Sequence, residues 1–426
     1  MTPQIKQRIE QIRSGEVPEG YKRTRAGIIP SDWFLHPLTQ HLTESRITGT
    51  NGAVAKKLTV KLWNKGVLEK REVHEGSEST TYYKRKAGQL IYSKLDFLNC
   101  AFGIIPQQLD GYESTQDLPC FDINGVDPCY LLTYLTQRNF YTHFGMIADG
   151  GRKARRIGPK DMLSFPLVYP PLSEQKKIAE ILQTQDKLIE LQQKKIEELK
   201  KLKKAYLSKM FPKKGCNVPE IRFPGFTDPW EQRKLGEIGS VSMCRRIFKE
   251  QTSETGDIPF YKIGTFGAEP DAFISRELFE EYKSKYPYPQ KGDILISASG
   301  SIGRTVEFAG NNEYFQDSNI VWLKHDERLS NPFLKCFYSV VKWAGIEGST
   351  IKRLYNDNIL NTVICMPSVP EQERIGVFFE NLDHLITLHQ RKLEEMKIYK
   401  KSLMQLLLTG IVRTKGENEC LSRQNR

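Results

Sequence analysis

Lysines and arginines grouped in short clusters are the side chains of this sequence whose types and spacing favour chemistry with a polyanion. Such cations neutralise phosphate groups, and an arginine also donates hydrogen bonds to the guanine edge in the major groove of DNA. The clustered residues are Lys84, Arg85, Lys86, Arg152, Lys153, Arg155, Arg156, Arg245, Arg246, Lys352 and Arg353. They predict contacts with nucleic acid, and the alternative is that each cluster is a solvated face of the protein.

A glycine-containing run from Ser297 to Arg304 is the second feature that suits a phosphate. It follows an apolar stretch typical of a strand, so its backbone N–H groups and the Arg304 guanidinium are candidates to bind an anion. The other interpretation is a plain glycine-rich turn. The run is not the phosphate loop of a nucleotide hydrolase, because the Gly-Lys-Ser/Thr ending is missing.

One motif favours catalysis in this chain itself. Asp127-Pro-Cys-Tyr130 resembles the Asp-Pro-Pro-Tyr loop with which amino-methyltransferases hold a flipped adenine. No glycine-rich S-adenosylmethionine loop that follows a strand precedes it. The seven histidines and eight cysteines form neither a metal-ligand spacing nor a Cys-x-x-Cys pair. We therefore expect no catalytic residue and no metal site.

The composition is that of a folded, basic chain with more than one domain. Its 426 residues exceed one ordinary core. The 63 lysines and arginines outnumber the 51 acidic residues, and the net charge of +12 favours nucleic acid as partner over an acidic membrane surface. With no apolar run of membrane-spanning length and no leader sequence, we expect a cytoplasmic protein that does not bind membranes.

The chain contains a tandem repeat that sets out its organisation. Residues 170 to 211 align without a gap onto 367 to 408, at an offset of 197. The same offset carries Trp33 to Leu38 onto Trp230 to Leu235, and Arg156 onto Arg353. Each copy is therefore predicted to be a globular domain followed by a helix.

Both repeated segments have apolar residues spaced alternately four and three apart, which is the seam of a coiled coil. The seam residues are Ile178, Leu182, Ile189, Ile196 and Leu199 in the first segment, and Ile375, Phe379, Leu382, Ile386, Leu393 and Met396 in the second. A single stripe cannot be buried within one helix, so the two helices are expected to pack on each other. Gln192 and His389 occupy equivalent polar seam positions that are candidates to set the register, and the alternative is that they lie at frayed or solvated points of the seam.

The predicted fold is α+β, with two mixed α/β domains and two long helices in a pseudo-twofold tandem repeat. The predicted boundaries are an N-terminal helix and arm at 1–30, a first domain at 31–170, a first helix at 171–214, a linker at 215–227, a second domain at 228–367, a second helix at 368–412 and a polar tail at 413–426.

Three stretches of this sequence resemble the specificity (S) subunits of type I restriction-modification systems. Residues 170–182 open the first long helix, 369–375 open the second, and 222–236 (Arg-Phe-Pro-Gly-Phe-Thr-Asp-Pro-Trp-Glu-Gln-Arg-Lys-Leu-Gly) open the second domain. Together with the repeat they cover nearly the whole chain. The first domain departs from the pattern, because it has Ala26-Gly-Ile-Ile-Pro30 where the second has Phe-Pro-Gly-Phe.

The resemblance implies two target-recognition domains, each of which reads one half of a split duplex DNA target. It also implies that the two helices run antiparallel, set the spacer between the half-sites and dock modification (methyltransferase) subunits, two in number. In that family, S-adenosylmethionine, ATP and Mg²⁺ act on the modification and restriction subunits, so the resemblance implies no cofactor in this chain.

Two other functions stay open from the residues alone. One is a self-contained DNA methyltransferase or nuclease, for which Asp127 to Tyr130 is the one supporting feature. The other is a coiled-coil scaffold that does not bind DNA, which leaves the globular domains and the basic charge unexplained.

Overall fold

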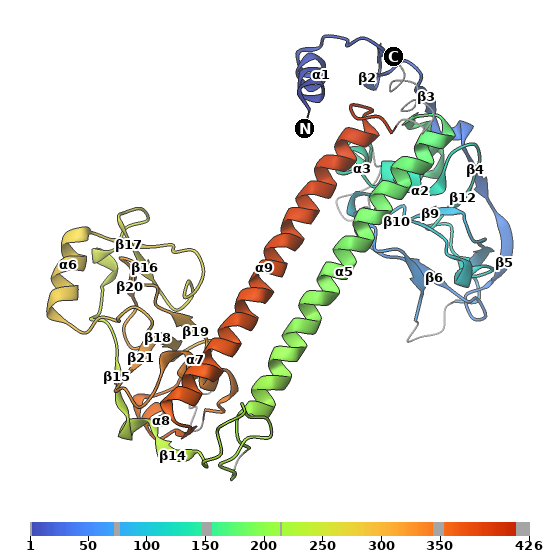
Figure 1. Cartoon of the computed structure of the whole chain (residues 1–426). Helices are drawn as coiled ribbons and strands as arrows, with labels where there is room; N and C mark the ends of the chain where they lie inside the picture. Colours follow the sequence, from blue (N-terminus) through green and yellow to red (C-terminus); the bar gives the residue numbers. More distant parts are fainter. Residues whose placement is uncertain (1, 72–76, 147–155, 214, 344–352, 415–426) are drawn as a thin grey trace. The chain divides into compact units, whose positions relative to one another are not determined.

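The computed structural model describes residues 2–71, 77–146, 156–213, 215–343 and 353–414, and it divides the chain into two compact units. Unit 1 contains residues 1–191 and 394–426, and unit 2 contains 192–393 (Figure 1). The divisions fall inside the two long helices, α5 (Leu172–Met210) and α9 (Val369–Leu408). Each unit therefore holds one globular domain together with part of both helices.

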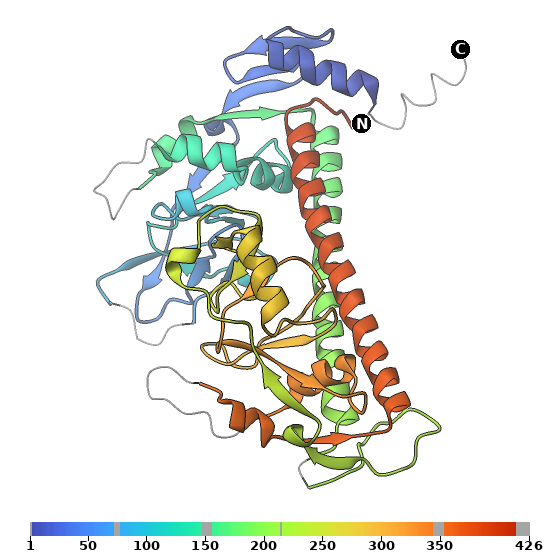
Figure 2. The same ribbon diagram turned by 90° about the vertical axis from the view of Figure 1, so that its left-hand side faces the viewer.

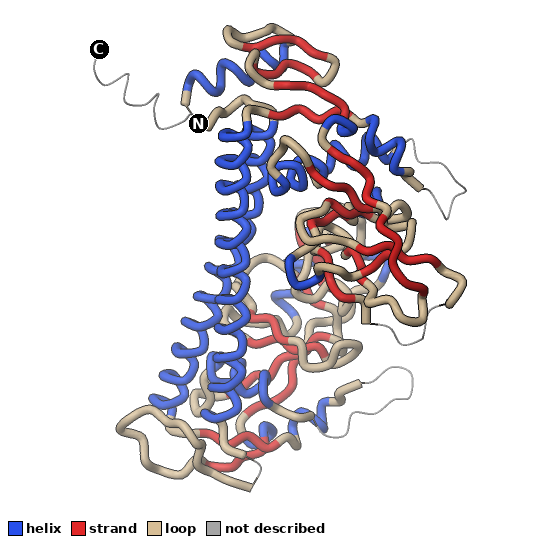
Figure 3. The backbone as a smooth tube through the Cα atoms, turned by 90° about the vertical axis from the view of Figure 1, so that its right-hand side faces the viewer, coloured by secondary structure: helices blue, strands red, loops and turns tan. Residues whose placement is uncertain are grey.

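The remaining elements follow the chain in order, and helices and strands are distinguished by colour in Figure 3. Unit 1 has α1 (Pro3–Ser14), β1 (Tyr21–Thr24), β2 (Gly27–Pro30), β3 (Phe34–Pro37), β4 (Leu42–Ser45), β5 (Ile47–Asn51), β6 (Leu58–Val60), β7 (Val67–Glu69), β8 (Thr81–Lys84), β9 (Leu90–Tyr92), β10 (Phe102–Ile104), β11 (Glu113–Ser114), β12 (Cys120–Ile123), α2 (Pro128–Leu135), α3 (Arg138–Gly145), α4 (Pro159–Ser164) and β13 (Pro166–Tyr169). Unit 2 has β14 (Glu231–Lys234), β15 (Gly239–Ser242), β16 (Ile258–Tyr261), β17 (Phe273–Ile274), α6 (Arg276–Lys285), β18 (Ile294–Ser297), β19 (Thr305–Glu307), β20 (Tyr314–Phe315), β21 (Ile320–His325), α7 (Asn331–Val340), α8 (Asn356–Leu360) and β22 (Val363–Met366).

The tandem repeat predicted from the sequence is confirmed in the sheet topology. In the described part of unit 1 an antiparallel four-stranded sheet has the order β10-β9-β12-β4, and in unit 2 the order β19-β18-β21-β15. These orders are the same once β4 is matched with β15, β9 with β18, β10 with β19 and β12 with β21. In each domain the first strand, β3 or β14, also pairs antiparallel with the last, β13 or β22.

The central strands β9 and β18 are buried on both of their faces, and residues 90–92 and 294–296 in them are all apolar. In β18, Ile294 and Ile296 pack into one core, whereas Leu295 points to the opposite face and packs into another. In β9, Leu90 and Tyr92 share a core with Trp33, and Ile91 lies on the other face. Each sheet is therefore a rigid layer between two sets of packed side chains.

In each unit a stretch of α5 lies beside a stretch of α9 (Figures 1 and 2). Lys203 Nζ lies 2.6 Å from Asp383 Oδ1 in unit 2, and Gln192 Nε2 donates to the His389 carbonyl at 2.8 Å. In unit 1 the equivalent lysine, Lys400, pairs with Asp186. Residues later in α5 therefore pair with residues earlier in α9, so the two helices are antiparallel.

The seam residues lie on the packed faces of the two helices. Eight of the eleven are buried, and Ile189, Leu382 and Met396 are half-buried. Ile178 and Leu182 join Leu407 and Leu408 in the core of unit 1, while Ile375 and Phe379 join Leu207 in unit 2. The ends of the helices are therefore part of the domain cores.

A buried Glu-Gln pair opens each long helix and ties it to its domain. Gln175 donates to the Pro170 carbonyl at 2.8 Å and accepts from the backbone N–H of Asp127 at 2.8 Å. Gln372 likewise donates to the Pro367 carbonyl and accepts from the N–H of Ser330, both at 2.9 Å. Asp127 and Ser330 are the N-cap residues of α2 and α7, so each glutamine fixes the start of a domain helix.

The glutamate of each pair is held by an arginine that follows the other long helix. In unit 2, Arg222 Nε and Nη2 each lie 2.7 Å from a Glu371 carboxylate oxygen. In unit 1, Arg413 donates to both oxygens of Glu174 at 2.8 and 2.7 Å and also contacts Asp32. Such bidentate pairs compensate the desolvation of a carboxylate that sits within a core.

We expect the Arg222→Ala substitution to lower the free energy of unfolding by about 3–5 kcal/mol, because it leaves a buried carboxylate without a counter-charge. The Glu371 side chain is 1% exposed. Arg233→Ala is the matched control, since Arg233 pairs with Glu231 where both side chains are exposed, and we expect no measurable change. Urea unfolding of the full chain measures both, and equal effects would contradict the assignment.

Candidate nucleic-acid interface

In unit 2, four strands of the central sheet bring their loops to one edge. Ser242 at the end of β15 pairs with Trp322 of β21, and Ser297 at the end of β18 pairs with Ile320 at the start of β21. Because these strands are antiparallel, the loops after β15 and β18 and those before β19 and β21 lie at the same edge.

The sequence-predicted basic residues described in unit 2 gather at this edge, which we call the basic edge of unit 2: Arg245, Arg246, Arg304 and Arg353. Arg246 Nε lies 2.9 Å from Asp317 Oδ2, and Arg353 Nη2 donates to the Ser318 carbonyl at 3.2 Å. Both partners are in the loop before β21. Arg304 Nη2 donates to the Gly267 carbonyl at 3.1 Å, and the Arg245 guanidinium lies 5.2 Å from the centre of the Tyr286 ring. Arg245, Arg246 and Arg304 are exposed and Arg353 is half-buried.

The Ser297 to Arg304 run is a hairpin loop between β18 and β19, with its own hydrogen bonds. The N–H of Gly303 donates to the Ser297 carbonyl at 3.0 Å, and the N–H of Arg304 donates to Ser297 Oγ at 2.9 Å. The N–H groups of Gly303 and Arg304 are therefore engaged within the loop, which favours the interpretation of this run as a glycine-rich turn. Arg304 remains a candidate for a DNA contact because its side chain is exposed.

Unit 1 has the equivalent edge, with the repeated arginine at the equivalent place. Arg156 Nε lies 3.9 Å from Asp117 Oδ1, in the loop before β12. The next residue, Ile157, donates to the Lys94 carbonyl after β9 at 3.1 Å, just as Leu354 donates to the Ala298 carbonyl after β18 at 2.8 Å. Together with Arg46, which follows β4, Lys94 and Arg156 form the basic edge of unit 1.

Arg85 does not belong to a DNA-contacting surface, which corrects the prediction for the Lys84-Arg85-Lys86 cluster. It is 2% exposed, and its guanidinium donates to Ser114 Oγ, the Ser45 carbonyl and the Leu118 carbonyl at 2.8, 2.8 and 3.2 Å. Burial lowers the pKa of Arg85. It is a structural cation that joins β4, β11 and the loop before β12. Lys84 and Lys86 are exposed, but Lys86 precedes β9 and so lies at the opposite end of that strand from Lys94.

Four further predicted contacts, Arg152, Lys153, Arg155 and Lys352, lie outside the described residues. Two residues at the basic edge of unit 1 were missed from the sequence. Arg46 is 69% exposed and Trp63, at the tip of the β6–β7 hairpin, is 56% exposed. Neither lies in a basic cluster or a motif, and the sequence offers only a weak signal, which is a tryptophan between two lysines, Lys61 and Lys65.

Asp127 caps a helix, and this accounts for the motif that favoured catalysis. Its carboxylate accepts from the N–H groups of Cys129 and Tyr130 at 3.0 and 2.9 Å at the start of α2. Pro128 occupies the first helical turn, and the buried Tyr130 donates to the Val168 carbonyl at 2.9 Å. Each residue of Asp-Pro-x-Tyr thus has a structural role. The Tyr130 side chain is buried in the core, so it is not available to stack on a flipped base.

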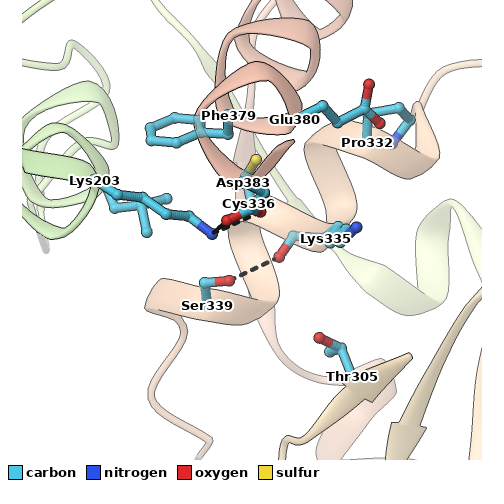
Figure 4. A pocket seen from close by; sticks show the side chains of 10 residues that line it. Lys203, Thr305, Pro332, Lys335, Cys336, Ser339, Phe379, Glu380 and Asp383 are labelled. Carbon is cyan, nitrogen blue, oxygen red and sulfur yellow. Dashed lines mark hydrogen bonds and ion pairs between the residues drawn. The ribbon is translucent and has the colours of Figure 1, made fainter. Parts of the chain in front are cut away.

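A cavity of about 230 Å³ lies in unit 2 where α7 meets the long helices (Figure 4). Lys203 and Asp383 pair across it, and Lys335 pairs with Glu307 at 2.9 Å, so its lysines are already compensated. None of the four arginines of the basic edge lines this cavity. It carries no feature of a nucleotide site.

Within the described ranges, no group of three or more His, Cys, Asp or Glu residues is arranged to hold a metal ion. Over the same ranges, no helix is both long and apolar enough to cross a membrane.

The comparisons with known proteins agree on one family. The model of the type I restriction modification DNA specificity domain matches residues 121–201 and 227–397, more than half of the chain. A putative type I restriction enzyme specificity subunit of Haemophilus influenzae is 45% identical over 267 residues, which are 61% of this chain and 66% of that protein, just under two thirds of its length. The putative MjaX specificity subunit of Methanocaldococcus jannaschii is 24% identical over 93% of this chain and 97% of its own length.

Solved structures show the same fold. The type I restriction-modification S subunit from M. genitalium has a TM-score of 0.53 at 14% identity and covers 88% of this chain and 96% of its own. A chain from a study of complex assembly and conformational transition of the type I R-M system has a TM-score of 0.56 at 17% identity and covers 90% and 99%. The match of the family model to more than half of the chain establishes that this chain belongs to the type I restriction modification DNA specificity family, as a specificity subunit with two recognition domains.

Proposed function

We propose that each unit reads one half of a split duplex DNA target through its basic edge, and that α5 and α9 together set the spacer between the halves. The observation that carries this proposal is the placement of Arg156 and Arg353. Repeated in the sequence, they contact the loop before the equivalent strand, β12 or β21, in two domains whose other loops differ. Arginine side chains at this edge of each sheet, exposed in Arg156 and half-buried in Arg353, suit both phosphate and guanine recognition.

The long helices also dock two modification subunits, and restriction subunits complete the assembly. The outer faces of the helices support this role, because Leu191 and Leu388, which match in the repeat, are 61% and 44% exposed. S-adenosylmethionine, ATP and Mg²⁺ then act on those partner subunits, and this chain contributes no catalytic group. The assembly works on the chromosome in the cytoplasm.

Replacing Arg156 or Arg353 by alanine should weaken binding of the assembled complex to its target duplex by roughly 5- to 100-fold if the side chain reads a base. A phosphate contact would instead reduce the salt slope of binding by about one. Each variant is expected to affect the half-site of its own domain. Arg233→Ala, in an exposed pair on β14, is the matched control. If both variants bind as the unmodified complex does at every salt concentration, the basic edges are not the interface.

Asp127→Ala should cost about 1 kcal/mol of stability through the lost helix cap, whereas Asp127→Asn keeps the cap and should be neutral. Neither should change the methylation rate of DNA-saturated complex, because the carboxylate serves α2. Single-turnover methylation and thermal unfolding measure the two effects separately. A large loss of methylation rate in both variants, with DNA affinity intact, would support the methyltransferase alternative.

Seven residues added after both Gln192 and His389 should lengthen the spacer of the target by about three base pairs and leave the half-sites unchanged. These residues face each other and match in the repeat, so one extra heptad per helix keeps the seam in phase. Seven residues rise roughly 10 Å, and base pairs stack at about 3.4 Å. The second half-site also rotates by roughly 100°, so activity should fall. Methylation-site mapping on random DNA checks this, and an unchanged spacer would show that the helices do not set it.

A further inference from the structure

The tip of the β6–β7 hairpin in unit 1 presents an aromatic side chain to solvent. Residues 61 to 65, Lys-Leu-Trp-Asn-Lys, are all exposed, and Trp63 and Leu62 are 56% and 39% exposed. Indole is among the largest apolar groups in proteins and is usually covered. Because the Trp63 ring is largely exposed, it contributes little to the hydrophobic core of the domain.

The backbone at this tip is held in a conformation that large side chains disfavour. Trp63 and Asn64 have φ values of 58° and 53°, in the left-handed region that glycine and asparagine occupy more readily. The N–H of Trp63 donates to the Asn99 carbonyl at 2.8 Å, and that of Asn64 to the Cys100 carbonyl at 2.9 Å. Asparagine is ordinary at such a position, but tryptophan is not. A strained, exposed and firmly held residue is typical of a functional site.

The tip is attached to the basic edge of unit 1. Asn99 and Cys100 lie near the end of the loop between β9 and β10, and Lys94 lies near its start, where its backbone is hydrogen-bonded to Asp117 and Ile157. Lys61 and Lys65 flank the tryptophan and add positive charge to that edge. The tip therefore extends the surface that includes Arg46 and Arg156.

The hairpin also belongs to the part of the domain that differs between the two copies. It lies between β5 and β8, whereas the described residues between β15 and β18 in unit 2 form β16, β17 and α6. Two halves of an asymmetric target must be distinguished by what the two domains do not share. The tip of the hairpin is thus placed where a difference in recognition is required.

We propose that Trp63 is a DNA-contacting residue for the half-site of the first domain, where its indole packs against or between bases. Lys61 and Lys65 neutralise the neighbouring phosphates, and the Asn64 amide lies within reach of a base edge. Aromatic and apolar side chains at such tips unstack base steps or stack on exposed bases. This inference rests on the proposed function and deepens it. The flanking lysines favour DNA over an apolar protein partner, for which charge at the centre of an interface is unfavourable.

The test compares Trp63→Gly and Trp63→Phe in the assembled complex, with Leu68→Ala as the matched control. Leu68 is 49% exposed on β7 of the same hairpin but lies away from the tip. Trp63→Gly removes the ring and relieves the left-handed backbone, so affinity for a duplex carrying the mapped target should fall by about 10-fold or more while the Tm does not fall. Trp63→Phe should keep most of the affinity, and Leu68→Ala should bind normally.

Duplexes with one half-site scrambled locate the effect. For Trp63→Gly, the loss of affinity caused by scrambling should become smaller at one half-site and stay unchanged at the other. If the unmodified complex prefers its target and the Trp63→Gly complex has the same affinity and the same preference, the inference is wrong while the proposed function stands. If Trp63→Gly instead weakens assembly with modification subunits in the absence of DNA, the tip is a protein contact and the inference is also wrong. A complex that shows no preference for its target without any substitution would overturn the proposed function itself.

Discussion

The buried carboxylates at the starts of the two long helices are the constraint on which the rest of the structure depends. Glu174 and Glu371 lie within domain cores, where an unpaired charge is strongly destabilising, so each requires its arginine. Arg222 follows α5 but holds the start of α9, and Arg413 follows α9 but holds the start of α5. The two helices are therefore anchored reciprocally, and unit 1 is built from two separate stretches of chain, 1–191 and 394–426.

This anchoring holds the start of each long helix in a defined position against its domain core. The neighbouring glutamines, Gln175 and Gln372, extend it by pinning the N-termini of α2 and α7. The central strands β9 and β18 pack on both faces, so the loops that follow them are held at defined positions. The two copies differ in their loops and insertions, such as β6–β7 in one copy and β16, β17 and α6 in the other.

Sequence reasoning succeeded where a pattern repeats and erred where burial decides. The repeat of Arg156 and Arg353 led to equivalent edges, because a fixed offset implies a shared frame. Arg85 looked like its exposed neighbours, yet the turn after β8 directs it inward to three acceptors. Asp127 looked like part of a base-binding loop, yet a hydrogen bond from its N–H to Gln175, 48 residues away in sequence, fixes it as a helix cap.

The sequence by itself determined the two-copy organisation, the apolar seam of the helices and the family, because these depend on periodicity and local motifs. Tertiary structure alone decided which cations face solvent, since exposure depends on how strands far apart in sequence come together. It also exposed Trp63, whose position follows from hydrogen bonds to Asn99 and Cys100 rather than from any property of residues 61 to 65. Periodicity can be read from the sequence alone, whereas the environment of a single side chain depends on its contacts with residues far away in the sequence.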